Sequence, residues 1–409
     1  MTTYRRRLFA LLCGVVVFEG FDASVTNLVV PYVGREFSAG PAELGAALSL
    51  VGLGAVLAFF TIRLGDRFGR RPVILWSVLG FSLCSLATTF TGDLRQFVIL
   101  QFSARVCLVT QISTAYILLS EALPAAMRGR ANGFMAAFAS FGAALPAILL
   151  HPAEASAFGW RSLFVIGAAP LLLLPSLWLC IRESELYLVR QREAQHPPSI
   201  GEQLRTLTAP HVRVRFLTMS AVWFVISFWS AATGAFFTYY VLQERAWTTR
   251  DVQLVAPFAL VFGFSGYALS GWLMDRIGRR HAAAILLLLA TVVTMVGYYA
   301  MDFRVIAACW MSIQMLMGVW VVAHVINSEL FATEVRAAAN GLCENLLGRW
   351  GFVFGPGVVG WLAGPLGATG HAVIVLACIN LLAIPLLLWV LPETRQVDLS
   401  RAGVEPLPR

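Results

Sequence analysis

Long apolar segments separated by short polar loops recur along the whole chain. Each segment runs for about 20 residues with few charges, which as a helix is long enough to cross the hydrocarbon of a bilayer. The pattern therefore predicts an all-α membrane protein with twelve transmembrane helices. The predicted spans are residues 8–32, 44–63, 73–91, 96–120, 130–151, 163–181, 216–242, 253–274, 282–300, 304–328, 338–363 and 371–391.

The longest polar stretch, residues 182–215, lies between the sixth and seventh predicted spans. Such a stretch is typical of a linker between two folded halves. We therefore predict an N-terminal six-helix half over residues 1–181, a cytoplasmic linker over 182–215, a C-terminal six-helix half over 216–394 and a cytoplasmic tail over 395–409.

The composition agrees with a membrane location. Of the 409 residues, 58% are hydrophobic and 13% are charged, which is too little charge to cover the surface of a soluble protein of this size. The net charge of +8 comes from arginines that cluster in alternate short loops. This placement indicates membrane orientation and contact with lipid headgroups rather than nucleic-acid binding, and it places both termini in the cytoplasm.

The sequence also argues against several kinds of chemistry. The chain contains no lysine and no phosphate-binding loop, so direct ATP-driven transport is not expected. Its seven cysteines lie mostly in apolar segments without metal-ligand spacing, which predicts small buried residues. Because no nucleophile-and-base pattern is recognisable, we expect no enzyme activity, no cofactor and no metal site.

A short basic motif occurs twice, about half a chain apart. Each copy follows an apolar span and places an aspartate before Arg, Gly and Arg, with a second acidic and basic pair further along at nearly the same offset. The first copy contains Asp66, Arg67, Gly69 and Arg70, followed by Glu121 and Arg128; the second contains Gly271, Asp275, Arg276, Gly278 and Arg279, followed by Glu329 and Arg336. Two features that recur in the same order indicate a duplicated unit, which is how many transporters are built.

This motif resembles the helix 2–3 motif of the major facilitator superfamily, Gly-x-x-x-Asp-Arg-x-Gly-Arg-Arg. The second copy matches it at every position, and the first departs once, with Ile62 in place of the first Gly. The Pro392-Glu393-Thr394 ending also resembles that of sugar-porter-like members. The resemblance implies two pseudo-symmetric six-helix halves around a central substrate cavity lined by spans one, four, seven and ten.

The repeated motifs are predicted to control gating. Asp66 and Asp275 end a span at the cytoplasmic face, where they can accept hydrogen bonds from the N-terminus of a helix in the opposite half. In the superfamily this contact holds the inside closed. Glu121 and Glu329 are expected to pair with nearby arginines of the same clusters.

Two carboxylates in the first span are candidates for proton coupling. Glu19 and Asp22 are spaced i,i+3 and so share a helix face, and a carboxylate at membrane depth is costly unless it is paired, hydrated or protonated. The alternative is a structural pair bonded to a neighbouring helix. The segment resembles the Asp-Gly-x-Asp signature of aromatic acid:proton symporters, with Glu19 for the first Asp, and the Glu-x-Phe-Asp of metabolite:proton symporters. Because Asp22 lies deeper, it is predicted to exchange the proton, with Glu19 modulating it.

Polar and aromatic side chains in three other spans are candidates for a substrate cavity. Arg105 in the fourth span offers bidentate donors to a carboxylate, or else forms a structural ion pair. The remaining candidates are Trp223, Trp229 and Tyr239 in the seventh span and Gln314, His324 and Asn327 in the tenth. Tyr239 could equally be an interfacial anchor, and a lone histidine such as His324 is commonly part of the hydrogen-bonded structure.

Together these features predict a secondary active transporter that moves a small organic acid or other small metabolite as a proton symporter. Its expected partners are the substrate, protons and the lipid bilayer. We expect a monomer in the bacterial inner (plasma) membrane. A proton-driven exporter of drugs or metabolites remains an alternative, as does a non-transporting sensor with the same fold.

Overall fold

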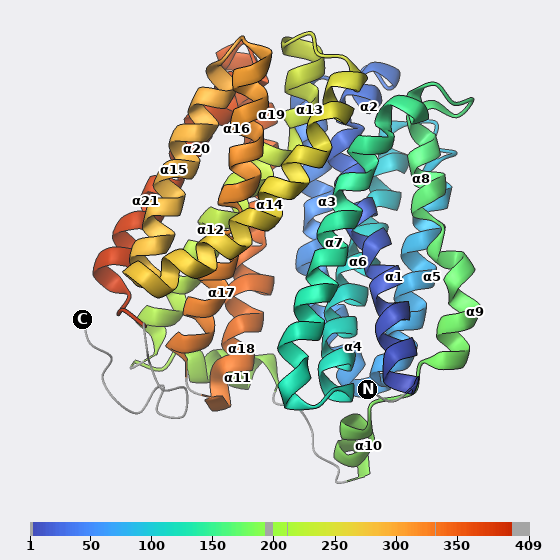
Figure 1. Ribbon diagram of the computed structural model, residues 1–409, viewed down its shortest axis with the longest axis vertical. Helices are drawn as coiled ribbons and strands as arrows, with labels where there is room; N and C mark the ends of the chain where they lie inside the picture. The colour runs from blue at the N-terminus through green and yellow to red at the C-terminus, as the bar shows by residue number, and fades with distance from the viewer. Residues whose placement is uncertain (1–2, 193–198, 211, 332, 395–409) are drawn as a thin grey trace. The chain divides into compact units, whose positions relative to one another are not determined.

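The computed structural model describes residues 3–192, 199–210, 212–331 and 333–394, and the described residues fold into helices and short connections (Figure 1). The chain divides into two compact units, each of which is considered by itself. Unit 1 comprises residues 1–39, 50–197 and 247–256, and unit 2 comprises residues 40–49, 198–246 and 257–409. The main division falls inside the predicted linker. Two short segments depart from the predicted halves: residues 40–49, from the N-terminal half, belong to unit 2, and residues 247–256, from the C-terminal half, belong to unit 1.

The first half of the chain contains the helices of the first six predicted spans. In chain order they are α1 (Thr3–Leu28), α2 (Val30–Glu36), α3 (Pro41–Ile62), α4 (Leu64–Phe68), α5 (Arg70–Thr88), α6 (Leu94–Ala122), α7 (Ala125–Glu154), the 3-10 turn η1 (Gly159–Arg161), α8 (Ser162–Gly167) and α9 (Pro170–Cys180). Pro31 and Pro170 each lie in the first turn of a new helix, where the missing N–H costs least. The predicted spans 8–32 and 163–181 are therefore divided helices.

The second half begins with the short linker helices α10 (Glu185–Arg192) and α11 (Ile200–Leu207). The helices that follow are α12 (Arg213–Ala235), α13 (Phe237–Tyr239), the π turn η2 (Tyr240–Glu244), α14 (Thr249–Ile277), α15 (Arg279–Tyr299), α16 (Phe303–Leu316), α17 (Val319–Leu330), α18 (Thr333–Asn340), the π-helix η3 (Gly341–Gly348), α19 (Trp350–Leu366), α20 (Thr369–Ala377), α21 (Asn380–Pro385) and the π turn η4 (Leu386–Val390).

Eleven helical stretches among the described residues are long and apolar enough to cross a bilayer. The predicted span 338–363 is not among these eleven stretches, and it is divided among α18, η3 and α19. Helix α19 has 17 residues, which corresponds to about 25 Å and falls short of the hydrocarbon thickness. Each of the twelve predicted spans is nevertheless mostly helical over its described residues, with short turns within several of them.

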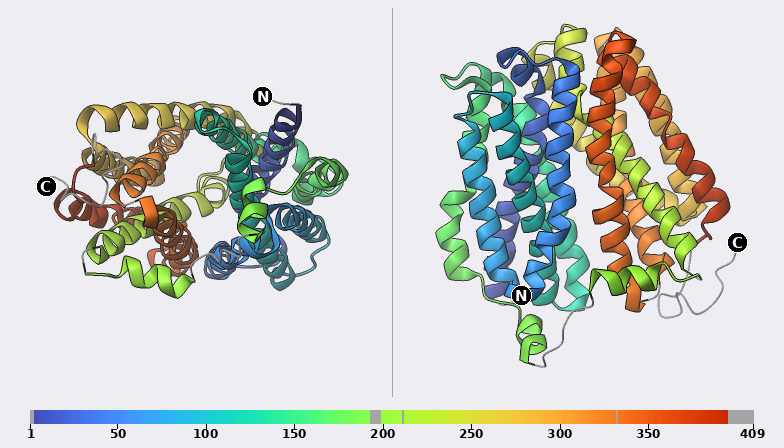
Figure 2. Two further views of the ribbon diagram at one scale, coloured as in Figure 1. Left: turned by 90° about the horizontal axis from the view of Figure 1, so that it is seen from below. Right: turned by 180° about the vertical axis from the view of Figure 1, so that it is seen from behind.

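Packing within each unit brings together helices that are distant in the sequence. In unit 1, α1 runs beside α7 and α5 beside α6 (Figure 1). In unit 2, α12 lies against α19, and α15 lies against α16 and α20; the same helices are seen from below and from behind in Figure 2. Large apolar side chains remain on the outside, such as Leu172, Leu179 and Trp389, each more than 80% exposed. Such a surface suits contact with lipid.

A polar clasp joins the connections at one end of unit 1. Glu36, at the end of α2, accepts hydrogen bonds from Arg161 Nη1 at 2.5 Å and from Trp160 Nε1 at 3.0 Å. The other arm of Arg161 donates to the carbonyl of Thr91 at 2.8 Å. The Arg161 hydrogen bond is the main reason why the pKa of Glu36 lies below its usual value.

The predicted linker is more ordered than a polar coil. Ser199 and Glu202 form a capping box at the start of α11, in which each side chain bonds the backbone of the other residue. The hydrogen bond from the Ser199 backbone lowers the pKa of the Glu202 carboxyl. Residues 193–198 of the linker and the predicted tail 395–409 lie outside the described residues.

Candidate functional site

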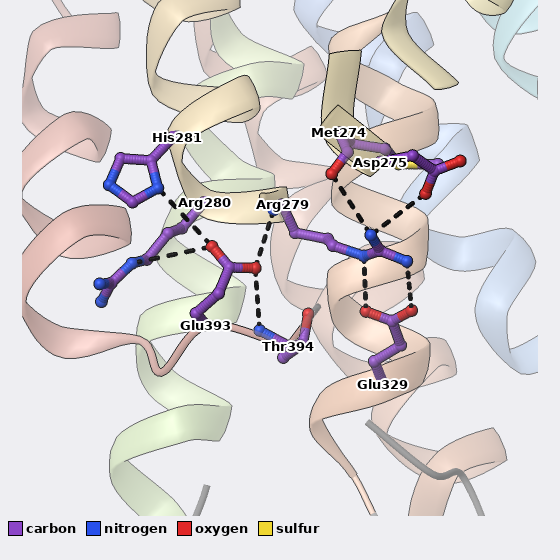
Figure 3. A network of polar contacts seen from close by, with 8 residues as sticks. All are labelled: Met274, Asp275, Arg279, Arg280, His281, Glu329, Glu393 and Thr394. Carbon is purple, nitrogen blue, oxygen red and sulfur yellow. Dashed lines mark hydrogen bonds and ion pairs between the residues drawn. The ribbon is translucent and has the colours of Figure 1, made fainter. Parts of the chain in front are cut away.

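The repeated basic motif forms a polar network in unit 2 (Figure 3). Arg279 Nε and Nη2 donate to the two oxygens of Glu329 at 3.1 and 3.2 Å, a bidentate pair. Nη1 of the same guanidinium contacts Asp275 Oδ1 at 3.1 Å and the carbonyl of Met274 at 3.3 Å. One arginine thus joins the end of α14, the start of α15 and the end of α17.

A third carboxylate completes this network from the C-terminal end of the unit. Glu393 Oε1 accepts from the backbone N–H groups of Arg279 at 2.8 Å and Thr394 at 3.0 Å. It therefore caps the N-terminus of α15, where unpaired N–H groups and the helix dipole attract an anion. Gly278 has a φ of 97°, and a Cβ there would lie 2.6 Å from Glu393 Oε2. The motif needs glycine at this position because of both the backbone conformation and the carboxylate.

Unit 1 contains the corresponding network. Arg70 contacts Asp66 at 3.0 Å and Glu121 at 3.3 Å, and it donates to the carbonyl of Gly65 at 2.6 Å. The pairing predicted for Glu121 and Glu329 with arginines of their own clusters is therefore confirmed. Glu183 caps the N-terminus of α5 through the N–H groups of Arg70 at 2.8 Å and Arg71 at 3.2 Å.

The capping carboxylates Glu183 and Glu393 were not predicted as site residues. The Pro392-Glu393-Thr394 ending was noted only for its resemblance to other proteins, and no structural role was predicted for it. A usable signal was present, because Glu183-Ser184 and Glu393-Thr394 follow the sixth and twelfth spans at equivalent places. In unit 1 the glycine of the motif again has a positive φ, 99° at Gly69, beside the carboxylate.

The other predicted gating residues lie around these networks. Arg67 and Arg276 stack over the rings of Phe68 and Trp272, at 5.3 and 5.0 Å from the centroids. Arg128 donates to the carbonyl of Leu123, and Arg336 donates to that of Phe331, at 3.0 and 3.3 Å. Gly271 stands at an open position, where an added Cβ would meet no described atom within 4 Å. The contact of Asp66 and Asp275 with the opposite half stays a prediction.

Asp22 lies inside unit 1 among α1, α5 and α8. Its side chain is 2% exposed and accepts a hydrogen bond from Ser85 Oγ at 2.8 Å. The same hydroxyl lies 3.1 Å from the carbonyl of Phe164, and a Cβ on Gly167 would lie 3.2 Å from Asp22 Oδ1. Asp22 is therefore bonded to a neighbouring helix, as the structural alternative expects, and its role in proton exchange stays a prediction.

A ladder of neutral polar groups continues one turn beyond Asp22. Thr26 donates to Gln101 Oε1 at 2.7 Å, and Gln101 Nε2 donates to Thr88 Oγ1 at 2.9 Å. All three side chains are buried, so each hydrogen bond satisfies a group that would otherwise be costly at membrane depth. The ladder ties α1, α5 and α6 together beside the carboxylate.

Arg105 approaches the same region from α6. Its Nη2 donates to the carbonyl of Ala23 at 3.3 Å, next in the chain to Asp22, and the guanidinium attracts that carboxylate. Glu19 is half-buried one turn earlier on α1. The structure therefore brings Arg105 close to Asp22, as predicted, whereas the exchange of protons between them stays a prediction.

An aromatic cluster with one histidine lies in unit 2. The rings of Trp223 and His324 are 4.8 Å apart between centroids, and those of Trp223 and Trp320 are 5.3 Å apart. Trp320 Nε1 donates to Ser230 Oγ at 3.1 Å, which fixes the indole. His324 Nδ1 lies 3.4 Å from Glu344 Oε2. Two predicted residues, Trp223 and His324, are thus joined by Trp320 and Glu344, which were not predicted.

The remaining predicted cavity residues are placed differently. Trp229 is fully buried and donates to Thr294 of α15 at 3.1 Å, so it packs inside unit 2. Tyr239 is half-buried and meets Phe236 edge to face at 6.0 Å. Gln314 is half-buried on α16, whereas Asn327 is fully buried on α17. We do not include Trp229 or Tyr239 in the candidate site, and their cavity role stays a prediction.

Residues with metal-binding chemistry do not gather in the described part of the chain: no group of three or more His, Cys, Asp or Glu there could hold a metal ion. The candidate site therefore consists of side-chain hydrogen-bond and charge interactions. It comprises the networks of the doubled basic motif, the Asp22 region of unit 1 and the Trp223–His324 cluster of unit 2.

Comparison with known families decides the class of the protein. A family model described as the Major Facilitator Superfamily matches residues 12–270 and 224–408. The chain belongs to the Major Facilitator Superfamily. It is therefore a multi-pass integral membrane protein of a transporter family, not an enzyme. The expected twelve-helix fold of this superfamily is confirmed.

Relatives of this superfamily member include proteins named for aromatic acids. The niacin transporter NiaP of Acinetobacter baylyi is 24% identical over 93% of this chain and 92% of its own length. The 4-hydroxybenzoate transporter PcaK of Pseudomonas putida is 28% identical over 71% of each protein. The crystal structure of a D-xylose-proton symporter superposes with a TM-score of 0.76 at 18% identity, covering 96% of this chain and 99% of that one.

Proposed function

We propose that this protein carries a small organic acid across the membrane together with protons, by alternating access. The relatives named as niacin and 4-hydroxybenzoate transporters direct the proposal to planar aromatic monocarboxylates. The observation that carries the proton coupling is Asp22, a carboxylate 2% exposed within the apolar helix α1. A charge at membrane depth is rare without a functional reason.

Asp22 is proposed to load and release the transported proton. One hydrogen bond from Ser85 does not compensate a full negative charge in an apolar surrounding. The nearby Arg105 guanidinium favours the ionised carboxylate when it is close, and its withdrawal would favour the protonated form. A change of conformation that makes and breaks this approach would couple proton movement to transport. Glu19, one turn away, is proposed to modulate the exchange.

The doubled network of Arg70 and Arg279 is proposed to hold the gating aspartates in place. Each guanidinium binds the aspartate of its own motif and a glutamate of a later helix. The arginine would then fix the position of each aspartate side chain, so that Asp66 and Asp275 could contact the opposite half. Substitution of either aspartate should slow the conformational change more than it weakens substrate binding.

The protein is proposed to act as a monomer in a bacterial inner membrane with both termini in the cytoplasm. The arginine asymmetry between alternate loops supports this orientation. Single cysteines placed at Ser156 and Arg304 of a cysteine-free variant should react with an impermeant thiol reagent in intact cells. A cysteine at Glu202 in the linker should react only after the cells are opened. Labelling of position 202 in intact cells would reverse the orientation.

Uptake by proteoliposomes tests the proposed function. Radiolabelled nicotinate, benzoate and 4-hydroxybenzoate would be supplied with and without an imposed gradient that is acidic outside. Symport predicts accumulation above the outside concentration only when the gradient is present. Substrate exit driven by the same gradient would instead support the alternative of a proton-driven exporter, and the absence of any flux for these acids would refute the proposed substrate class.

A further inference from the structure

The pair His324 and Glu344 lies in unit 2, and the His324 side chain is more exposed than its neighbours on the same helix. The His324 side chain is 50% exposed, although its neighbours Val322, Ala323 and Ile326 on α17 are buried. The Glu344 side chain is 15% exposed, and its Oε2 lies 3.4 Å from His324 Nδ1. One nitrogen of the imidazole therefore lies within ion-pair distance of Glu344, and half of the side-chain surface is exposed.

We propose that His324, held by Glu344, receives the carboxylate of the substrate and binds it only when the imidazole is protonated. This inference rests on the proposed function and deepens it, because it adds a second proton-dependent group in unit 2. The substrate class is a planar aromatic monocarboxylate. The half-buried Trp320 would lie against the ring, and His324 would hold the carboxylate.

The proton requirement follows from the two nitrogens of the imidazole. A neutral imidazole has one N–H, and the Glu344 carboxylate, which only accepts, draws that N–H to Nδ1. Nε2 then carries a lone pair, which repels a second carboxylate. Protonation adds an N–H at Nε2, so that the imidazolium can donate to Glu344 and to the substrate at once. Binding thus takes up one proton with each substrate anion, and loss of that proton expels the anion.

The surroundings of His324 suit an aromatic ring bearing polar substituents. The buried Trp223 ring lies 4.8 Å from the imidazole and 5.3 Å from the Trp320 ring, between centroids. Trp320, His324 and Asn327 lie on one face of α17, because they are spaced i,i+4 and i,i+7. Both polar atoms of the Asn327 amide are buried without a hydrogen-bond partner among the described residues.

An unpaired buried polar group is costly and points to a ligand that satisfies it. The indole N–H of Trp223 is also buried and has no partner among the residues that the structure describes. Because both residues are 0% exposed, a hydroxyl group or a ring nitrogen, such as those of 4-hydroxybenzoate and nicotinate, would reach these atoms only after the side chains move. The cluster therefore offers the Trp320 ring, buried polar groups and one imidazole that can become a cation.

Other titratable groups near α17 are engaged elsewhere or lie at the helix ends. The elements that pack against α17 are α12, α15 and α18. Among their described side chains and those beside η3, the charged or titratable groups are Arg213, Arg215, Arg279, Arg280, His281, Tyr298, Tyr299, Arg336, Cys343 and Arg349. Arg279 holds Glu329 of α17 itself, and Arg349 donates to Asn345 at 2.9 Å. Within this described set, the contact found for His324 is with Glu344.

Equilibrium binding to the full-length protein in detergent tests the proposal. The two probes are benzoate, which stays ionised between about pH 5.5 and 8.5, and benzamide, its neutral isostere. For the wild type, benzoate binding should weaken by up to about tenfold per pH unit as His324 loses its proton. Benzamide binding should be independent of pH. This comparison needs no variant, so it does not depend on the folding of a mutant.

Three variants separate His324 from other sources of pH dependence. His324→Gln should weaken benzoate binding at the acidic end by about tenfold to a hundredfold and abolish its pH dependence. Glu344→Gln should weaken benzoate binding at the acidic end, because the imidazole loses the carboxylate that orients it. His371→Gln is the matched control, since His371 is an exposed histidine of unit 2 that contacts the Leu366 carbonyl, and it should retain the wild-type pH profile.

The outcomes distinguish this inference from the proposed function. If wild-type proteoliposomes accumulate benzoate but His324→Gln keeps the wild-type affinity and pH profile, the inference is overturned and the proposed function stands. If benzamide binds with the same pH dependence as benzoate, the carboxylate is not what His324 receives, and the inference is again overturned. If the wild type neither binds nor transports any aromatic acid, both are refuted.

Discussion

Replacement of Glu329 by glutamine tests whether the bidentate pair holds the ends of α14, α15 and α17 together. In the structure, Glu329 accepts from Arg279 Nε and Nη2 at 3.1 and 3.2 Å, and the two side chains are 15% and 14% exposed. Glutamine has nearly the same shape. It keeps one acceptor oxygen, loses the charge and turns an NH2 group toward the guanidinium.

The expected loss follows from the burial of the pair. A hydrogen bond to a charged group contributes about 1.5–3 kcal/mol net, and breaking a fully buried ion pair costs about 3–5 kcal/mol. Arg279 retains Asp275 and the Met274 carbonyl, so part of its charge stays compensated. We therefore expect Glu329→Gln to lower the free energy of unfolding by about 1–3 kcal/mol.

Asp275→Asn is the matched control on the same arginine. The Asp275 side chain is 70% exposed and makes one contact with Arg279, at 3.1 Å. Exposed pairs of this kind contribute about 0.2–1 kcal/mol. Asp275→Asn should thus change the melting temperature little, whereas Glu329→Gln should lower it clearly.

The assay is the thermal unfolding of purified protein in detergent, followed with a thiol-reactive dye on the buried cysteines, such as Cys13 and Cys343. Transport in proteoliposomes is measured on the same preparations. Equal melting temperatures for Glu329→Gln and the wild type would refute the assignment of a stabilising pair. A larger loss for Asp275→Asn than for Glu329→Gln would show that burial does not set the energy of this network.

Three further predictions concern gating, coupling and pH. Asp66→Asn and Asp275→Asn should slow transport while equilibrium substrate affinity changes less, and normal transport rates at normal membrane levels would remove both residues from the gate. Asp22→Asn should abolish accumulation driven by a pH gradient but leave some counterflow, which needs no net proton movement; full accumulation in this variant would leave Glu19 or His324 to carry the proton. Because Arg161 lowers the pKa of Glu36, the clasp stabilises unit 1 above the usual carboxyl pKa and is lost as the pH falls through the lowered value. Arg161→Gln should therefore lower the melting temperature at neutral pH and match the wild type in acid, and a pH-independent difference would contradict this assignment.

The spans and the doubled motif could be predicted because both are local properties of the sequence. The length of an apolar segment is enough to predict a membrane helix, and the recurrence of the motif is enough to predict the duplication. The networks around Arg70 and Arg279 follow from the same local pattern, since the aspartate lies four residues before the arginine on adjoining helices. Only the capping carboxylates Glu183 and Glu393 were overlooked there.

The direction in which a membrane side chain points could not be predicted from the pattern. A span that is apolar all round gives no moment from which to tell its lipid face from its packed face. Trp229 and Trp320 illustrate this, because both are tryptophans in apolar helices, yet Trp229 bonds Thr294 inside the unit and Trp320 adjoins His324 through Trp223. Glu344 was missed for a related reason, because its contact with His324 depends on how closely η3 approaches α17.

The central claim, that organic acid and proton move in the same direction, is tested by recording the pH inside proteoliposomes as the acid enters. A pH-sensitive dye is trapped inside vesicles without an imposed gradient, and 4-hydroxybenzoate is added outside. Symport predicts acidification of the interior that depends on the protein, saturates with substrate and is lost in Asp22→Asn. Alkalinisation of the interior on substrate entry, or entry of substrate with no change of internal pH, would contradict the account.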